Sequence, residues 1–200
     1  MKNIFLMTIV GLFSLNAAAQ SPNDVISEAA ELLDQALNER KDALGQDKEA
    51  LYDLIDGILL PRFDRKYAAQ QVLGKHWRSA KPEQQDRFVN AFYQSLLRKY
   101  AEGVLEFDQS KIVILPFRGD LSKPRVTVKT TVRLDDGTKV PVDYALVKRD
   151  SSWLIFDVVI EGISYIITFR SEMNNEIQRT SLDAVIERLE SDATGVASGE

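Results

Sequence analysis

The sequence predicts an α+β fold in which N-terminal helices pack on one face of a four-stranded antiparallel sheet, followed by C-terminal helices. Up to about residue 105, apolar residues recur every three or four positions, as on one face of a helix. Beyond about residue 111 they recur at every second position, as in half-buried strands. Asp135-Asp136-Gly137 lies between two such alternating runs and is typical of a hairpin turn. A chain in which the helices come first and the strands follow is expected to belong to the α+β class.

The N-terminus has the composition of a secretory signal peptide over residues 1–19. Lys2 is followed by an apolar run at residues 4–15, which is too short to span a bilayer. Ala17-Ala18-Ala19 then provides a small-residue cleavage site. We therefore expect cleavage before Gln20 and an exported protein without stable membrane insertion, and the cleavage motif fits the bacterial periplasm.

The rest of the chain is expected to form one domain over residues 20–190. The sequence has no cysteine, so an exported chain of this length must be held together by its core and not by disulfides. Residues 191–200 are small and polar, and we expect them to form a disordered tail.

Four helices are expected before the sheet, and their ends are marked by capping residues. Ser21 and Pro22 open the first helix as N-cap and first-turn proline. Gly74 is placed to stop the third. Residues 75–81, which include Trp77, are expected to be a polar loop. The four helices are predicted at about residues 21–45, 47–60, 64–73 and 82–105.

Four strands are expected to follow as an antiparallel meander. Pro141 lies in the third, and since proline donates no ladder hydrogen bond, we expect an edge or a bulge there. The strands are predicted at about residues 111–117, 125–134, 140–146 and 153–160.

Residues 158–173, VVIEGISYIITFRSEM, fit either a strand that runs on or a turn into a helix. Strand alternation stops at Arg170, whereas apolar residues at helical spacing continue to Ile177. Gly162 provides a break and Ser164 an N-cap, so we predict a helix. A last helix is expected at residues 181–189.

Composition argues against several classes of function. The net charge is −5, whereas nucleic-acid binding leaves a basic footprint. His76 is the only histidine, and with no cysteine beside it neither a metal site nor a Ser-His-Asp arrangement is expected. We therefore expect no catalytic residue, no metal and no cofactor.

Short motifs recur in a characteristic order and spacing over residues 25–189. They are Leu60-Pro61, Lys66-Tyr67-Ala68, Val72-Leu73-Gly74, Trp77-Arg78, Pro82, Gln85, Phe88, Phe92, Leu96, Tyr100, residues 153–157, Glu161-Gly162-Ile163-Ser164 and Arg170. Together they resemble the MlaC family of periplasmic phospholipid-binding proteins, also described as toluene-tolerance or ABC-transporter auxiliary components. Met173 departs from the family, which more often has an aromatic residue there.

The resemblance implies a nuclear-transport-factor-like wedge with a cavity for the acyl tails of a phospholipid, whose head group faces water. It implies a carrier that shuttles lipid between an outer-membrane lipoprotein/porin complex and an inner-membrane ABC transporter, maintaining outer-membrane lipid asymmetry. The phospholipid would be cargo, not cofactor. A diacyl lipid exposes about 30 methylenes in water, which costs roughly 24 kcal/mol, so only a dry cavity can hold the tails.

We expect the C-terminal helix that begins near Ile163 to hold this cavity open against the sheet. Whether the aromatic stripe of the fourth helix packs in the core or touches the tails stays open, as does whether Arg170 reaches the rim or a phosphate. The expected lipid-binding residues are Phe92, Leu96, Tyr100, Val126, Val128, Val142, Tyr144, Val158, Ile160, Ile163, Ile167, Arg170, Met173 and Ile177.

A basic cluster near Trp77 is either a solvated face or a docking patch for an acidic partner; it comprises Lys75, Arg78, Lys81 and Arg87. Two other functions compete with lipid carriage. One is a protein-binding module or chaperone with an apolar groove. The other is an isomerase-like enzyme of the same fold, although Asp143 and Tyr144 are adjacent on a strand and so point to opposite faces, which argues against it.

Overall fold

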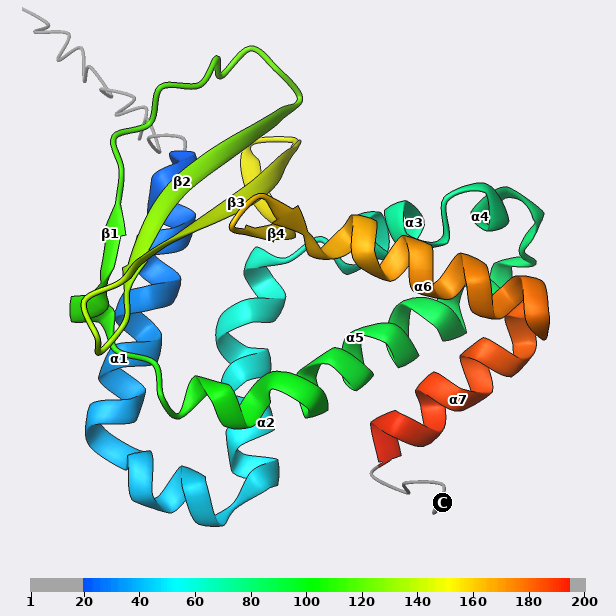
Figure 1. Cartoon of the computed structure of the whole chain (residues 1–200), viewed down its shortest axis with the longest axis horizontal. Helices are drawn as coiled ribbons and strands as arrows, with labels where there is room; N and C mark the ends of the chain where they lie inside the picture. The colour runs from blue at the N-terminus through cyan, green and yellow to red at the C-terminus, as the bar shows by residue number, and fades with distance from the viewer. Residues whose placement is uncertain (1–19, 195–200) are drawn as a thin grey trace, which may run out of the picture.

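The computed structural model describes residues 20–194 and has the α+β architecture that the sequence predicts (Figure 1). Helices come first, a five-stranded antiparallel sheet follows in the order β1-β2-β3-β4-β5, and two helices complete the described chain. Each strand pairs with its neighbour in the sequence, so the sheet is the expected meander.

The N-terminal helices begin and end near the predicted positions. The Ser21 hydroxyl accepts a hydrogen bond from the Asp24 amide at 3.2 Å, and Asp64 accepts one from the Tyr67 amide at 2.9 Å. Gly74 ends α3 with a φ of +51°, which only glycine adopts readily. The helices are α1 Pro22–Gln46, α2 Lys48–Leu59, the 3₁₀ turn η1 Leu60–Arg62, α3 Arg65–Leu73, α4 Lys75–Ser79 and α5 Pro82–Val104.

Helix α4 corrects the expectation of a loop around Trp77. It is five residues long, and the Ala80 amide closes it by donating to the His76 carbonyl at 3.0 Å. Such a single turn is too short to show an apolar period, so no periodic pattern predicts it.

The sheet contains one strand more than predicted, because β5 adds two residues beside β4. Pro141 lies within the interior strand β3 but opposite the end of β4, where the Glu161 amide donates to its carbonyl at 3.0 Å. The ladder between β3 and β4 begins at Val142 and Ile160, so the missing N–H of Pro141 lies just beyond its end. The strands are β1 Ile112–Ile114, β2 Arg125–Arg133, β3 Lys139–Arg149, β4 Ser152–Ile160 and β5 Ile163–Ser164, with the 3₁₀ turn η2 Gln109–Lys111 before them.

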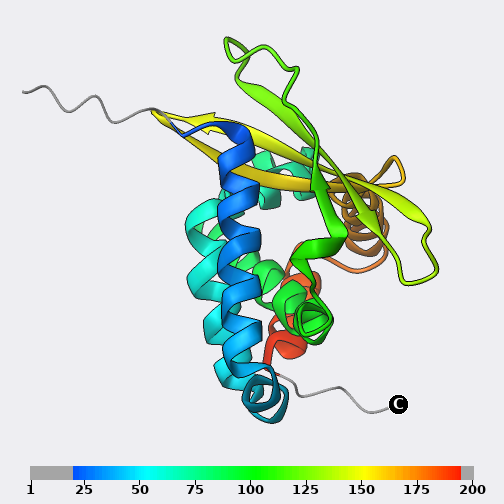
Figure 2. The same cartoon turned by 90° about the vertical axis from the view of Figure 1, so that its left-hand side faces the viewer.

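Helix α1 covers one half of the inner sheet face. Its residues Val25 and Ile26 are buried in one cluster with Val126 and Val128 of β2. Figure 2 shows the sheet above the helices, with α1 rising to meet it. The half of the face at the end of β4 is not part of this cluster, and the candidate site lies there.

The helix predicted in the 158–173 stretch is confirmed. Helix α6 spans Tyr165–Arg179, and the hydroxyl of its N-cap Ser164 accepts a hydrogen bond from the Ile167 amide at 3.1 Å. Glu161 and Gly162 make the turn before it with positive φ values of 52° and 82°. The strand therefore stops here, and the apolar residues that follow belong to a helix.

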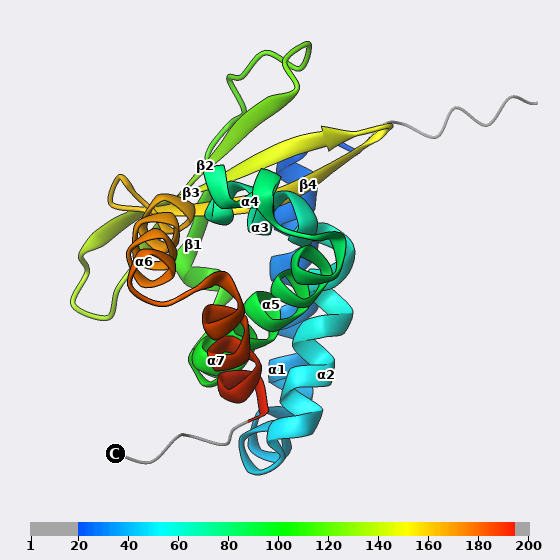
Figure 3. The same cartoon turned by 90° about the vertical axis from the view of Figure 1, so that its right-hand side faces the viewer.

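The last helix, α7, spans Leu182–Thr194 and packs along α5 (Figure 3). Residues 191–194 are therefore helical, although they were expected in a disordered tail. The rest of the predicted tail and the predicted signal peptide lie outside the described residues. Over residues 20–194, no helix combines the length and the apolar character that crossing a membrane requires.

Candidate functional site

An apolar pocket of about 410 Å³ lies between the helices and the inner face of the sheet. Asp157 is the only charged residue in the lining of this pocket. The volume falls within the range of roughly 300–1,000 Å³ that is common for ligand sites. The lining consists of Ile55, Leu59, Phe63, Phe92, Tyr93, Leu96, Leu97, Tyr100, Ala101, Val104, Tyr144, Ile155, Phe156, Asp157, Val158, Ile160, Tyr165, Ile166 and Phe169.

Six of the residues predicted to bind lipid line this pocket. They come from α5, from the middle of β3 and from the last residues of β4, where Tyr144 pairs with Val158. Tyr100 is 42% exposed at the rim, whereas Phe92 is 4% exposed and also belongs to the core. The stripe on α5 is thus both core and pocket wall. The six are Phe92, Leu96, Tyr100, Tyr144, Val158 and Ile160.

The three valines predicted from β2 and β3 lie elsewhere. Val126 and Val128 point to the predicted face of the sheet but are covered by α1. Val142 is buried outside the lining of the pocket. Alternation identified the right face, but the position of α1 decides which half of that face is available.

The five residues predicted on the C-terminal helix also lie outside the pocket. Ile163, which belongs to β5, and Ile167 of α6 are 63% and 64% exposed. Arg170 caps α3, since its Nε donates to the Gln71 carbonyl at 2.6 Å. The remaining two, Met173 and Ile177, pack in the core formed with α3, α5 and α7.

Helix α6 does form a wall of the pocket, but with Tyr165, Ile166 and Phe169. The apolar residues at helical spacing in this stretch cover more than one side of the helix, and only one side faces the pocket. The pocket-facing residues share a stripe with Met173, since Tyr165, Phe169 and Met173 are spaced by four. That spacing was the signal in the sequence that would have identified them.

The wall made by α2 and the second half of α5 was not predicted from the sequence. Ile55 and Leu59 come from the α2 stripe, which the sequence does display, but nothing local indicates that it faces a pocket. The missed residues of α5 are Tyr93, Leu97, Ala101 and Val104.

A row of aromatic rings borders the pocket from the core to the rim. Phe88 stacks on Phe92 with ring centroids 5.5 Å apart, and Phe92 and Phe169 pack edge to face with centroids 5.3 Å apart. Tyr165 lies 6.0 Å from Phe169 and 6.3 Å from Tyr100. Edge-to-face pairs of this kind add to the burial energy, so the row fixes α6 against α5.

Asp157 is nine-tenths buried, and its carboxylate is used to hold α6. One oxygen accepts from the Ser164 hydroxyl at 2.6 Å and the other from the Ile166 amide at 3.0 Å. These donors lie at the N-terminus of the helix, where a negative charge is favoured. The arrangement explains the buried charge structurally.

The two buried tyrosines of the pocket stay neutral. Burial raises the pKa of Tyr144 above the usual value for a phenol. Burial also raises the pKa of Tyr93, whose hydroxyl donates to Asp56 at 2.7 Å. Neither phenol therefore brings charge to the lining near neutral pH.

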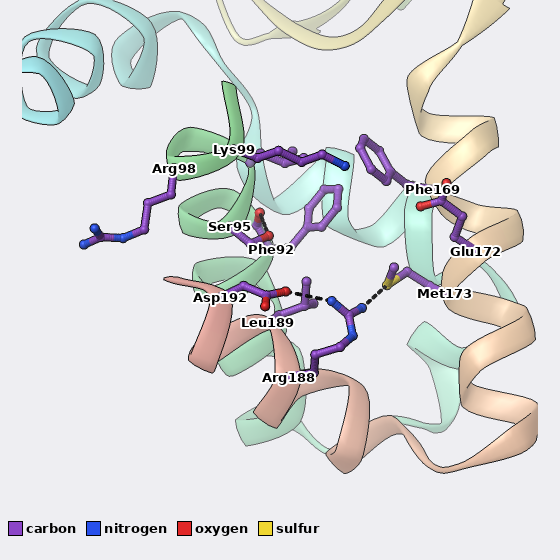
Figure 4. Close-up of a pocket in the computed structure, with 11 residues that line it drawn as sticks. Phe92, Ser95, Arg98, Lys99, Phe169, Glu172, Met173, Arg188, Leu189 and Asp192 are labelled. Carbon is purple, nitrogen blue, oxygen red and sulfur yellow. Dashed lines mark hydrogen bonds and ion pairs between the residues drawn. The ribbon is translucent and has the colours of Figure 1, made fainter. Parts of the chain in front are cut away.

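A second pocket of about 400 Å³ lies between α5, α6 and α7 (Figure 4). Its lining contains charged and polar side chains as well as apolar ones. Arg188 donates to Glu176 at 2.7 Å and to Asp192 at 2.8 Å, beside the predicted lipid-binding residue Met173. Phe92, Leu96 and Phe169 line both pockets, so they form the partition between them.

The predicted basic docking cluster is only partly free. Lys75, Arg78 and Lys81 are exposed on α4 and the turn after it. Arg87 is bound to Glu190 of α7 by two hydrogen bonds of 2.9 and 2.7 Å. His76 contacts the Asn174 side chain at 3.1 Å, and no set of three metal-ligating side chains occurs in the described part of the chain.

The fold and the site define a small α+β protein with an apolar binding pocket between its two layers. The chain belongs to the MlaC family, whose profile, described as MlaC protein, matches residues 27–191. The recognition made from the sequence motifs is therefore confirmed.

Two curated relatives extend over most of the chain. The toluene tolerance protein Ttg2D of Pseudomonas putida is 30% identical over 180 residues, covering 89% of this chain and 83% of the relative. The intermembrane phospholipid transport system binding protein MlaC of Haemophilus influenzae is 21% identical over 193 residues, covering 95% and 90%.

A solved structure has the same fold. It is the phospholipid-binding protein of Ralstonia solanacearum in complex with a phospholipid, with a TM-score of 0.78 and 23% identity. The match covers 90% of this chain and 100% of the other.

Proposed function

We propose that this protein is a soluble periplasmic carrier of phospholipid, with the acyl tails held in the pocket lined by α5, β4 and α6. The observation that carries the proposal is the pocket itself, with about 410 Å³ of space and a lining in which Asp157 is the one charged residue. Its carboxylate is already bonded to Ser164 and Ile166. The rest of the lining offers a ligand mostly apolar side-chain surface, which is the surface that buries acyl tails favourably.

The relatives support this cargo. The Haemophilus influenzae relative is named as the binding protein of an intermembrane phospholipid transport system, and the Ralstonia solanacearum structure holds a phospholipid. The carrier would shuttle lipid between an outer-membrane lipoprotein/porin complex and an inner-membrane ABC transporter. Because the tails are buried in membrane and carrier alike, transfer is nearly balanced, and the direction must come from the partners.

We propose Lys75, Arg78 and Lys81 as the part of the basic cluster that docks an acidic partner surface. They are exposed, and Arg87 is engaged with Glu190. Complementary charges at the exposed rim of a protein–protein interface mainly raise the association rate. Reversing Arg78 to Asp should abolish partner pull-down while leaving lipid bound, and unchanged pull-down would remove the patch from the proposal.

The enzyme alternative has little support from the geometry. Asp143 lies 3.7 Å from Lys129 on the outer face of the sheet, whereas the adjacent Tyr144 faces the pocket. The two therefore cannot act on one substrate.

The test is native mass spectrometry of the protein purified without detergent, followed by extraction and lipid identification. The expected result is a stoichiometric adduct of one or two phospholipids. Val158→Glu should remove it, since it places a charge in the pocket. Ile167→Glu is the matched control, because that residue is 64% exposed and outside the lining.

Tyr100→Glu is a second variant. It puts the fold at less risk, because Tyr100 lies at the rim of the pocket and its side chain is 42% exposed. Circular dichroism and thermal melts show that each variant is folded. A wild-type protein that carries no lipid, even after incubation with liposomes and partner complexes, would overturn the proposal. The protein-binding module with an apolar groove would then be favoured.

A further inference from the structure

The polar cleft between α5, α6 and α7 has a composition that suits the head group of the proposed lipid. It adjoins the apolar pocket through the partition of Phe92, Leu96 and Phe169. Lys99 of the cleft also lies against Tyr100 of the apolar pocket, so a lipid whose tails enter at Tyr100 has its polar end beside Lys99. The inference rests on the proposed function and extends it to the choice of lipid.

Two opposite charges face each other across this cleft. Lys99 comes from α5 and Glu172 from α6, both are exposed, and they form no ion pair with any described residue. Figure 4 shows the Lys99 side chain extending across the top of the cleft toward Phe169 and Glu172. Its Nζ lies 5.4 Å from the centre of the Tyr100 ring, at the rim of the apolar pocket.

The other cations of the cleft are already engaged. Arg188 is held by Glu176 and Asp192. Arg98 points away from the cleft in Figure 4. Its guanidinium lies 3.7 Å from the Glu49 carboxylate and 4.8 Å from the centre of the Tyr52 ring. Lys99 is thus the cation of the lining that is left for a ligand.

The charge balance selects one class of head group. With Arg98 directed away, the charged side chains of the lining are two cations and two anions, namely Lys99, Arg188, Glu172 and Asp192. Arg188 is already paired with Asp192 and with Glu176, which lies outside the lining. An anionic head group gains one contact at Lys99 but meets the unpaired carboxylate of Glu172. A zwitterionic head group places its phosphate at Lys99 and its ammonium beside Glu172, so both unpaired side chains gain a partner.

We infer that this cleft binds the head group of a zwitterionic phospholipid, with Lys99 as the phosphate contact and Glu172 as the ammonium contact. Phosphatidylethanolamine is the representative of this class with a hydrogen-bonding ammonium. Phosphatidylglycerol with the same acyl chains is the anionic comparison.

The experiment loads the protein from vesicles of equal parts of these two lipids and measures their ratio in the native mass spectrum. For the wild type we expect at least a threefold excess of phosphatidylethanolamine. Glu172→Gln should bring the ratio near one, and Lys99→Ala should lower the occupancy of both lipids. Glu187→Gln and Lys66→Ala are exposed controls that should leave ratio and occupancy unchanged.

A wild-type ratio near one, or a ratio that Glu172→Gln leaves unchanged, would overturn the inference. If neither lipid binds at all, the proposed function itself fails. Soluble phosphoethanolamine, titrated by calorimetry, separates a lipid head group from a free ligand. Tight binding of this soluble probe without any lipid preference would assign the cleft to a free metabolite instead.

Discussion

The Asp157 carboxylate accepts a 2.6 Å hydrogen bond from the Ser164 hydroxyl across the turn at Glu161-Gly162. The same carboxylate accepts a bond from the Ile166 amide at 3.0 Å. These contacts tie the end of β4 to the first turn of α6, and both elements contribute to the apolar pocket. The position of α6 as a wall therefore depends on one buried acid.

Asp157→Ala should destabilise the protein by about 2–3 kcal/mol, because it leaves the half-buried Ser164 hydroxyl and the buried Ile166 amide without their acceptor. Urea unfolding measures the loss. Hydrogen exchange should become faster at the Ile166 and Ile167 amides than elsewhere in the helix. Asp143→Ala is the control, since Asp143 makes a 3.7 Å ion pair with an exposed Lys129. Equal stability of the two variants would contradict this role.

Phe169 supports α6 from the other side and separates the two pockets. Phe169→Ala should cost about 2–3 kcal/mol, less than a fully buried phenylalanine, because Phe169 is half-buried. Ile167→Ala, two residues earlier but 64% exposed, should change stability by less than about 0.5 kcal/mol. Thermal unfolding followed by circular dichroism distinguishes them. Similar losses for both would mean that α6 packs in another rotation about its axis.

The turn before α6 depends on glycine at one position. Gly162 has a φ of +82°, so Gly162→Ala should destabilise by about 1 kcal/mol through backbone strain, although nothing lies within 4 Å of the added methyl. Gly57 is an exposed interior residue of α2 with equally open space, and Gly57→Ala should stabilise by about 1 kcal/mol. Chemical denaturation of both variants tests the opposite signs, and a shared sign would contradict the backbone explanation.

Much of the fold was predictable because its signals are local. The Ser21 and Ser164 caps, the Gly74 stop and the change of apolar spacing near residue 111 each act within a few residues. They identified the helices, the meander and the helix after Gly162. The short α4 carried no such signal.

The pocket was predicted only in part because its lining depends on tertiary packing. Val128 and Tyr144 alternate identically along their strands and pair in the sheet, yet only Tyr144 reaches the pocket. The difference is Val25 of α1, which packs over Val128 from about a hundred residues away. Likewise, the contact of Arg170 with Gln71 fixes which side of α6 faces outward, and no periodicity reveals that partner.

The ion pair between Arg87 and Glu190 joins α5 to α7, and it gives a pH-dependent prediction. Hydrogen bonding to Arg87 lowers the pKa of the Glu190 carboxyl in the folded protein. Its stabilisation is therefore present above the unfolded pKa of about 4.3 and is lost as pH falls through the lowered folded value. The effect is small, because the two side chains are 37% and 41% exposed and are screened by solvent.

Glu190→Gln should thus lower the urea midpoint at pH 7, and the difference from the wild type should shrink as the pH is taken down to about 3. Arg87→Asp should lower the midpoint as well, since it sets two carboxylates against each other. Arg78→Asp, on the exposed α4 with no ion pair in the described structure, should not. A midpoint that falls equally for Arg78→Asp and Arg87→Asp, or a Glu190→Gln difference that persists in acid, would show that the pair does not stabilise the contact between α5 and α7.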